Sequence, residues 1–171
     1  MTPRKFFCAL CLLLLVAACA ATPESTSRLD IEGAHRPEPG RTISGQPTPA
    51  ELVAAERAGV RHVVNARDIG EFEAWDEAEL VAALGMEYHR VPIGSPGDLN
   101  RAAVEDFDRI LAEIGDDPAL LHCASGNRIG ALYALRAAWI QGRDAESAIE
   151  IGKAHGLTSL ERPVRRKLGR N

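Results

Sequence analysis

Short apolar runs alternate with longer amphipathic stretches from residue 41 onward. Apolar or β-branched runs predict strands at 41–44, 60–65, 88–93 and 119–122. Apolar residues at helical spacing predict helices at 49–58, 72–84, 100–114, 129–141, 144–154 and 160–168. Strands that alternate with helices predict an α/β fold in three layers, with helices on both faces of a mainly parallel central sheet of about four or five strands.

The N-terminal segment has a different pattern. Two basic residues precede an apolar run over 6–18, which is shorter than the roughly 20 residues that a membrane-spanning helix needs. A basic start, a short apolar core and small residues after it predict a signal peptide over 1–18. The run Val16-Ala17-Ala18-Cys19 resembles the lipobox of bacterial lipoproteins, which implies that Cys19 is lipidated after cleavage. The alternatives are an ordinary signal cut near Ala21 and an uncleaved anchor.

Residues 19–40 contain Pro, Ser, Thr and charged side chains without an apolar period, and they predict a flexible tether. This tether would hold a domain of residues 41–171 away from the membrane that carries the lipid of Cys19. Ala20 stands where the lipoprotein sorting rule uses Asp to retain a protein at the inner membrane. The expected location is therefore the bacterial cell envelope, as a periplasm-facing lipoprotein of the outer membrane.

Net charge and cysteine content reduce the number of possible functions. The formal net charge is −4, so a basic surface that binds nucleic acid is not expected. Cys8 and Cys11 leave with the signal peptide and Cys19 carries lipid, which leaves Cys123 as the only thiol of the predicted domain. A lone thiol is either buried and inert or reactive. The histidines show no ligand-like spacing, so neither a metal site nor another cofactor is expected.

One loop combines a nucleophile with anion-binding groups: His122-Cys123-Ala124-Ser125-Gly126-Asn127-Arg128. It joins a buried strand to a helix, at the sheet edge where α/β proteins bind ligands. The small residues after Cys123 let backbone N–H groups point inward, and the helix adds its positive N-terminal end. These donors favour the nucleophilic thiolate, and Arg128 can bind two phosphate oxygens. The alternative is a buried, inert Cys beside an Arg that forms a salt bridge.

This loop resembles the signature loop of the protein tyrosine and dual-specificity phosphatase superfamily. Together with Ser44–Pro47 and Val63–Arg67, the run His122–Leu135 is similar to its bacterial branch, the beta-lactamase-hydrolase-like phosphatase domains. The resemblance implies a phosphatase that hydrolyses phosphate monoesters, on a phosphorylated protein or a small phosphate ester. It implies that Cys123 becomes a phosphocysteine. His122, directly before Cys123, is expected to orient the loop by hydrogen bonding, and the alternative is a buried histidine with satisfied hydrogen bonds. The phosphate would be bound by the remaining loop residues, Ala124, Ser125, Gly126, Asn127 and Arg128.

The resemblance also implies an Asp that protonates the leaving oxygen. Asp98 is the first choice, because it lies on the loop at 92–99, where the family often places its acid. Pro96-Gly97-Asp98 is equally typical of a plain turn. Asp68 and Glu71 are reserves, because they follow the strand at 60–65 and so lie at the same sheet edge.

Two departures from the family pattern leave other functions open. Only four residues separate Cys123 from Arg128, where phosphatases usually have five. A loop of this size also occurs in rhodanese-type sulfurtransferases, in which the Cys carries a persulfide. Ile129 replaces the Ser or Thr whose hydroxyl helps the thiolate leave, so breakdown of a phosphocysteine would be slow. The alternatives are therefore a sulfurtransferase and a pseudophosphatase that binds anions without turnover.

Overall fold

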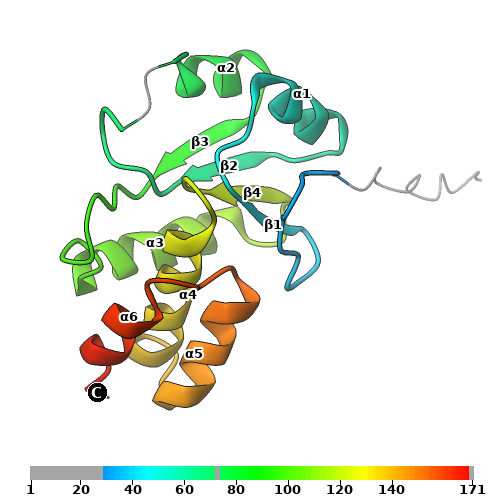
Figure 1. The fold of residues 1–171 in the computed structure, drawn as a ribbon. Coiled ribbons are helices and arrows are strands. Elements are labelled where there is room, and N and C mark those ends of the chain that lie inside the picture. Colours follow the sequence, from blue (N-terminus) through cyan, green and yellow to red (C-terminus); the bar gives the residue numbers. More distant parts are fainter. Residues whose placement is uncertain (1–28, 72–73, 170–171) are drawn as a thin grey trace, which may run out of the picture.

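The computed structural model describes residues 29–71 and 74–169, which form a four-stranded sheet between layers of helices (Figure 1). The predicted signal peptide and Cys19 lie outside the described residues. Within the described residues, no helix is long and apolar enough to cross a membrane.

All strand pairs in the sheet are parallel. The strands are β1 (Arg41–Ser44), β2 (His62–Asn65), β3 (Glu87–Arg90) and β4 (Ala119–His122). Their order across the sheet is β1-β4-β2-β3, so β4 and β2 are central and every residue of both is buried. The register places Ser44, Asn65 and His122 side by side at the carboxyl edge. Parallel sheets with both faces covered carry such continuous apolar strands.

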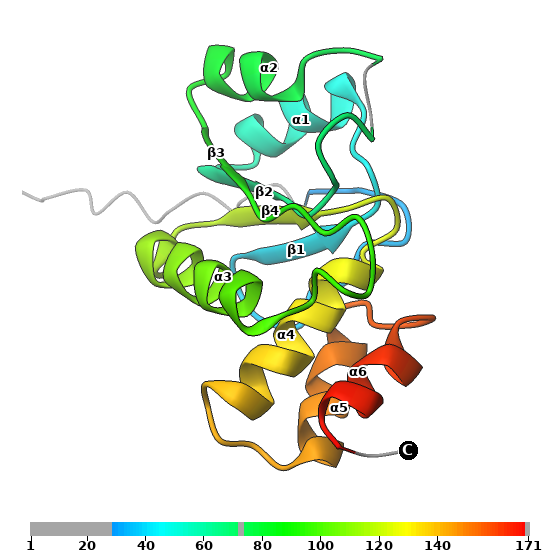
Figure 2. The ribbon, with the colours of Figure 1, turned by 90° about the vertical axis from the view of Figure 1, so that its left-hand side faces the viewer.

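Helices cover both faces of the sheet. The helices are α1 (Pro49–Arg57), α2 (Glu77–Ala83), α3 (Arg101–Ile114), α4 (Asn127–Trp139), α5 (Ala145–Ala154) and α6 (Glu161–Lys167). Figure 2 shows α1 and α2 on one side of the sheet and α3 and α4 on the other, with α5 and α6 packed beyond α4. The predicted three-layer α/β fold is confirmed.

Alternation along the central strands divides the core in two. Val63 and Leu120 pack with residues of α1 and α2, whereas Val64 and Leu121 pack with residues of α3 and α4. Helix α4 is apolar on most sides because α5 covers the face that the sheet leaves open. A Cβ on Gly130 would lie 2.1 Å from the backbone nitrogen of Leu157, so α4 approaches the segment after α5 at backbone contact.

Local signals set most helix starts. Thr48 and Glu51 form a capping box at α1, and Asn100 and Asp144 cap α3 and α5 with their side chains. Helix α2 differs from the prediction, because it begins at Glu77 after the cap Asp76 rather than near residue 72. The helical apolar spacing of 72–84 therefore extended beyond the true helix start.

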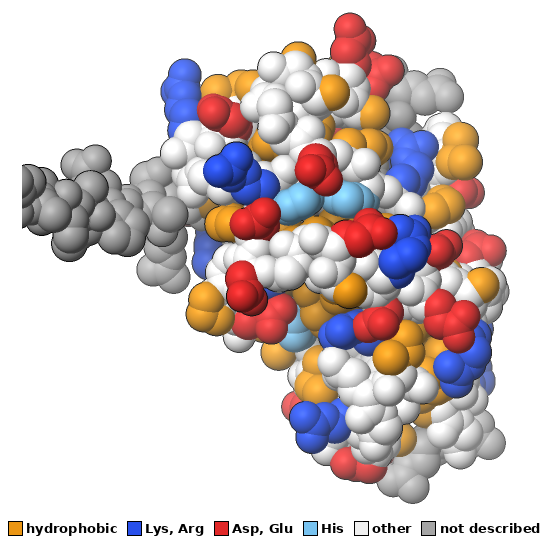
Figure 3. Space-filling model, turned by 180° about the vertical axis from the view of Figure 1, so that it is seen from behind, with side chains coloured by type: hydrophobic (Ala, Val, Ile, Leu, Met, Phe, Trp, Pro, Cys, Tyr) orange, Lys and Arg blue, Asp and Glu red, His pale blue; other side chains and the backbone are white. Residues whose placement is uncertain are grey.

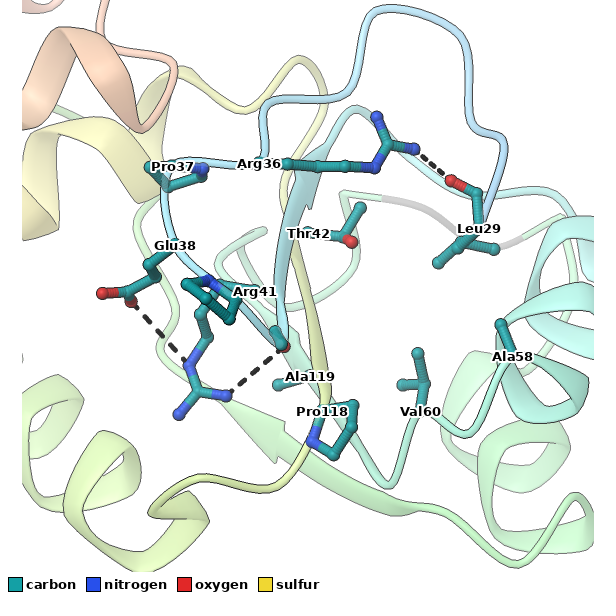
Figure 4. A pocket seen from close by; sticks show the side chains of 12 residues that line it. Leu29, Arg36, Pro37, Glu38, Arg41, Thr42, Ala58, Val60, Pro118 and Ala119 are labelled. Carbon is teal, nitrogen blue, oxygen red and sulfur yellow. Dashed lines mark hydrogen bonds and ion pairs between the residues drawn. The ribbon is translucent and has the colours of Figure 1, made fainter. Parts of the chain in front are cut away.

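Part of the expected tether packs against the domain. Leu29 and Ile31 are each only 7% exposed and belong to the core cluster on the α1 side. The backbone of His35 pairs with Ile43 of β1 in an antiparallel bridge. This segment and the start of β1 together line a cavity of about 560 Å³, and Arg36 closes one side by donating to the Leu29 carbonyl (Figure 4). Residues 29–40 are therefore part of the folded unit, because their apolar side chains complete the core.

Candidate active site

Cys123 directly follows the central strand β4. Its side chain is 1% exposed, and it is a free thiol. Because β4 lies between β1 and β2, the thiol stands at the middle of the carboxyl edge, where parallel sheets position ligands. The sheet topology therefore places Cys123 in a functional position.

The loop after Cys123 turns its backbone toward the sulfur. The Ser125 N–H donates to Cys123 Sγ at 3.5 Å. Gly126 has φ of 82°, a left-handed conformation that favours glycine, and it leads directly into α4. No side chain caps α4, so its first N–H groups and its positive end remain available to an anion. Gly45 supports the loop through a bridge to Ser125, at a spacing where a Cβ would lie 3.0 Å from the Ala124 carbonyl.

A cavity of about 250 Å³ opens above the thiol. Of the predicted site residues, those that line it are Cys123, Ala124, Ser125, Asn127 and Arg128. Gly126 is not among the lining residues and sets the turn instead. Other walls come from the segment after β3 and from the α5–α6 connection: Ile93, Gly94, Ser95, Pro96, Ser159 and Leu160.

Asn127 brings the α5–α6 connection to the cavity. Its Oδ1 accepts from the Thr158 N–H at 2.8 Å, and its Nδ2 donates to Ser159 Oγ at 2.7 Å. The side chain predicted to bind substrate is therefore 8% exposed and occupied in holding Ser159 in place. Sequence analysis missed Ser159, because nothing in its local sequence indicates a contact with a loop so distant in the chain.

Arg128 is held by a carboxylate at the cavity edge. Its Nη1 and Nη2 donate to Glu71 Oε2 and Oε1 at 2.6 and 3.0 Å. Arg67 Nε also donates to Glu71 Oε1, at 3.2 Å. The hydrogen bonds from Arg128 are the largest cause that lowers the pKa of Glu71 to about 2, and the Asp68 N–H and the charge of Arg67 add to the effect. The same contact raises the pKa of Arg128. Glu71 is therefore a charged partner of the arginine, which argues against its reserve role as a proton donor.

His122 is fully buried beneath the loop and lies against a buried acid, Glu77. Its Nε2 is 2.8 Å from Glu77 Oε1, an ion-pair distance without the alignment of a hydrogen bond. Glu77 is 5% exposed, and its other oxygen accepts from Asn65 Nδ2 at 2.7 Å. The contact ties the end of β4 to the first turn of α2. Sequence analysis missed Glu77, because acidic residues in a first helical turn are common and are usually solvated.

The two candidate acids lie in different surroundings. The Asp98 carboxylate accepts from the Ser95 N–H and Oγ at 2.7 and 2.9 Å, which lowers its pKa, and it does not line the cavity. Asp68 lies directly against Gly94, a cavity residue, because a Cβ there would be 2.3 Å from Asp68 Oδ2. Its charge also contributes, after Glu71 and Cys123, to the raised pKa of Arg128. Neither Asp98 nor Asp68 lines the cavity, and each contacts one residue that does: Asp98 contacts Ser95, and Asp68 contacts Gly94.

Comparison with known families identifies the family of this domain. A model of the family "Beta-lactamase hydrolase-like protein, phosphatase-like domain" matches residues 38–140. The chain belongs to this family. A beta-lactamase hydrolase-like protein from Agrobacterium fabrum is 34% identical over 121 residues, which is 68% of this chain and 27% of that protein. The phosphatase-like domain thus spans about a quarter of the length of the curated relatives it matches.

Solved structures share the fold of this phosphatase-like domain. A candidate phosphatase from Shewanella putrefaciens has a TM-score of 0.62 at 22% identity, over 86% of this chain and 94% of that one. TpbA from P. aeruginosa, solved in complex with pTyr, has a TM-score of 0.55 at 18% identity, over 78% and 80% of the two chains. At these identities the likeness supports the cysteine phosphatase-like fold alone.

Proposed function

We propose that this phosphatase-like domain is a cysteine-dependent phosphatase that hydrolyses phosphate monoesters through Cys123. The observation that carries the proposal is the placement of the thiol under the Ser125 N–H, at the N-terminus of α4, with Arg128 on the same cavity. Backbone donors and a guanidinium aimed at one point stabilise the charge of a transferring phosphoryl group. A thiol among these donors is activated as a nucleophile.

The proposed reaction has two steps. The Cys123 thiolate attacks phosphorus, the bond from phosphorus to the ester oxygen breaks, and the leaving oxygen takes a proton. Water then attacks the phosphocysteine and gives one proton to the deprotonated acid, the S–P bond breaks, and phosphate leaves as the thiolate is restored. Arg128 and the loop N–H groups bind the phosphoryl oxygens throughout. Ile129 supplies no hydroxyl to the departing thiolate, so the second step is expected to be the slower one.

We assign the leaving-group proton to Asp68. Its carboxylate lies against Gly94, which lines the cavity, and its charge acts on Arg128, whereas the Asp98 carboxylate accepts two hydrogen bonds from Ser95. This assignment departs from the first choice of the sequence analysis, and a role for Asp98 stays a prediction. His122 is a positioning residue, because its contact with Glu77 fixes the end of β4 directly before Cys123.

A rhodanese-like sulfurtransferase is the second candidate, and the four-residue span between Cys123 and Arg128 supports it. A pseudophosphatase is the third, and the occupied guanidinium of Arg128 supports that reading. Release of phosphate from an aryl phosphate and of thiocyanate from thiosulfate plus cyanide separates the three, measured for wild type and Cys123→Ser. Phosphate release that the mutation abolishes is the expected result. Thiocyanate release alone would overturn the proposal, as would anion binding without either activity.

The natural substrate in this proposal is a phosphorylated protein or a small phosphate ester. We further propose that a lipid on Cys19 anchors the domain at the periplasmic side of the outer membrane. Metabolic labelling with a fatty acid tests the anchor. Cys19→Ser should abolish labelling and leave the precursor uncleaved, while Cys11→Ser should change neither. Unchanged processing of Cys19→Ser would refute the anchor and would leave the phosphatase proposal intact.

A further inference from the structure

Two histidines and a glutamate meet at the amino-terminal edge of the sheet, away from Cys123. His62 begins β2 and pairs in register with Glu87, which begins β3. His89 lies two residues after Glu87, so its side chain is on the same face of β3. His62 Nδ1 and His89 Nε2 are 3.1 Å apart, and Glu87 Oε2 lies 3.6 Å from the first and 4.0 Å from the second. One ligand atom from each residue thus converges on one point.

These distances match the edges of a metal coordination shell. Zinc binds histidine nitrogen at about 2.0–2.1 Å, so two ligand atoms on a tetrahedral zinc are about 3.3 Å apart. The histidine nitrogens, 3.1 Å apart, are already close to this value, and a small movement of the exposed Glu87 side chain brings the other two edges to it. Two imidazoles with one carboxylate form a ligand set suited to zinc and related divalent transition ions.

A second carboxylate supports one of the histidines from behind. Asp117 Oδ2 lies 3.6 Å from His62 Nε2, the ring nitrogen that faces away from His89. Metal-binding histidines usually present their other N–H to a carboxylate, which fixes the ring and directs the remaining lone pair at the metal. Asp117 therefore lies within a small side-chain movement of the position that an outer partner of His62 would take.

Burial and charge at the cluster also suit a cation. The His62 and His89 side chains are 8% and 14% exposed, whereas the Glu87 side chain is 73% exposed and gives access from solvent. The histidine surface is bordered by acidic side chains on this face of the molecule (Figure 3).

Helix α3 adds charges of both signs beside this cluster. Glu113 and Arg109 lie close enough to His89 for their opposite charges to influence it. Because Arg109 is paired with Glu113 at 2.8 Å, its charge is largely balanced. The carboxylates of Glu87 and Asp117 are the charged groups that lie directly against the two histidines.

We propose that His62, Glu87 and His89 bind a divalent transition-metal ion, with zinc as the best fit, and that Asp117 orients His62. The ion would join central strand β2 to edge strand β3 and would stabilise the sheet. The histidines lie far apart in the chain, which is why the sequence analysis found no ligand spacing among them.

Calorimetric titration of Zn²⁺ into the purified, untagged full-length chain tests the proposal. His62→Gln and His89→Gln should each weaken one zinc site at least tenfold, and Asp117→Asn should weaken it about tenfold. His35→Gln, at an exposed histidine outside the cluster, and Cys123→Ser should both retain the site. Zinc should also raise the melting temperature of the wild type but not that of His89→Gln.

Co²⁺ spectra distinguish this site from binding by thiols. The expected spectrum has visible d–d bands that disappear in His89→Gln and persist in Cys123→Ser. Equal zinc affinity in the wild type and His89→Gln would overturn the proposal, as would Co²⁺ bands that depend on cysteine alone. Glu87→Gln alters an exposed side chain, so it provides the same comparison if a histidine variant fails to fold.

Discussion

Arg128 and Glu71 form a two-pronged ion pair at the edge of the Cys123 cavity, with N–O distances of 2.6 and 3.0 Å. Both terminal nitrogens of the guanidinium are therefore engaged by a carboxylate of the same chain. A phosphate that binds over Cys123 must share these donors with Glu71 or displace it. The affinity of the site for anions is thus set by a competition within the protein.

Glu71→Gln should tighten the binding of an oxyanion. The substitution removes a negative charge that repels the anion and competes for Arg128. An exposed ion pair contributes about 1 kcal/mol or less, so the dissociation constant for tungstate should fall about fivefold. Calorimetry measures this directly, and Glu113→Gln, which breaks a similar pair with Arg109 on α3, is the matched control. Weaker binding in Glu71→Gln would mean that Glu71 positions Arg128 for the anion.

The same pair should make stability depend on pH in the acidic range. Arg128 lowers the pKa of Glu71 from 4.5 to about 2, so the stabilisation is complete above pH 4.5 and is lost as the pH falls toward 2. With solvent screening it amounts to about 1 kcal/mol. Urea denaturation should show that the difference in the free energy of unfolding between wild type and Glu71→Gln shrinks as the pH falls through this window. A difference that stays constant would contradict the proposal that the Glu71–Arg128 pair is the source of the pH dependence.

Glu77→Ala should destabilise the domain strongly. The change removes the carboxylate that contacts buried His122 and one of the two acceptors of the Asn65 amide, and leaving a buried polar group unpaired costs about 1–3 kcal/mol. Glu79→Ala removes an exposed acid from the same helical turn and should cost less than 1 kcal/mol. Chemical denaturation compares the two variants. Equal effects would show that Glu77 acts only through the helix dipole.

Asp68→Asn should slow reactions that have poor leaving groups. A general acid contributes about 10²–10⁴-fold, and the contribution is largest when the leaving oxygen is basic. kcat/KM should therefore fall more for phenyl phosphate than for p-nitrophenyl phosphate. Asp98→Asn should leave the ratio of the two substrates unchanged. A change in the substrate ratio for Asp98→Asn but not for Asp68→Asn would identify Asp98 as the general acid.

Local sequence predicted the features that depend on neighbouring residues. The strand and helix order followed from apolar spacing, and the Cys123 loop followed from a nucleophile, small residues and an arginine in one run. Strand order did not follow, because β4 inserts between β1 and β2, and spacing along the chain does not encode this. The contacts that depend on strand order were therefore missed: His122 with Glu77, His62 with His89, and Asn127 with Ser159.

The start of the folded unit and the start of α2 were also not predictable from local sequence. Leu29 and Ile31 looked like parts of a tether because two apolar residues among polar ones carry no periodic signal. Their partners lie in the cluster beside α1 and β4, so their role depends on the finished core. The start of α2 was misplaced for a related reason, since helical spacing alone does not identify Asp76 as the cap.

Trapping the reaction intermediate tests the central claim most directly. The wild type is mixed with an aryl phosphate, and the reaction is quenched during turnover. The protein is then digested, and the mass of the peptide that contains Cys123 is measured by mass spectrometry. We predict one added phosphoryl group on Cys123, formed in a burst of aryl alcohol release because Ile129 leaves the second step slow. Turnover without any adduct on Cys123, or a sulfur atom there in place of phosphate, would contradict the account.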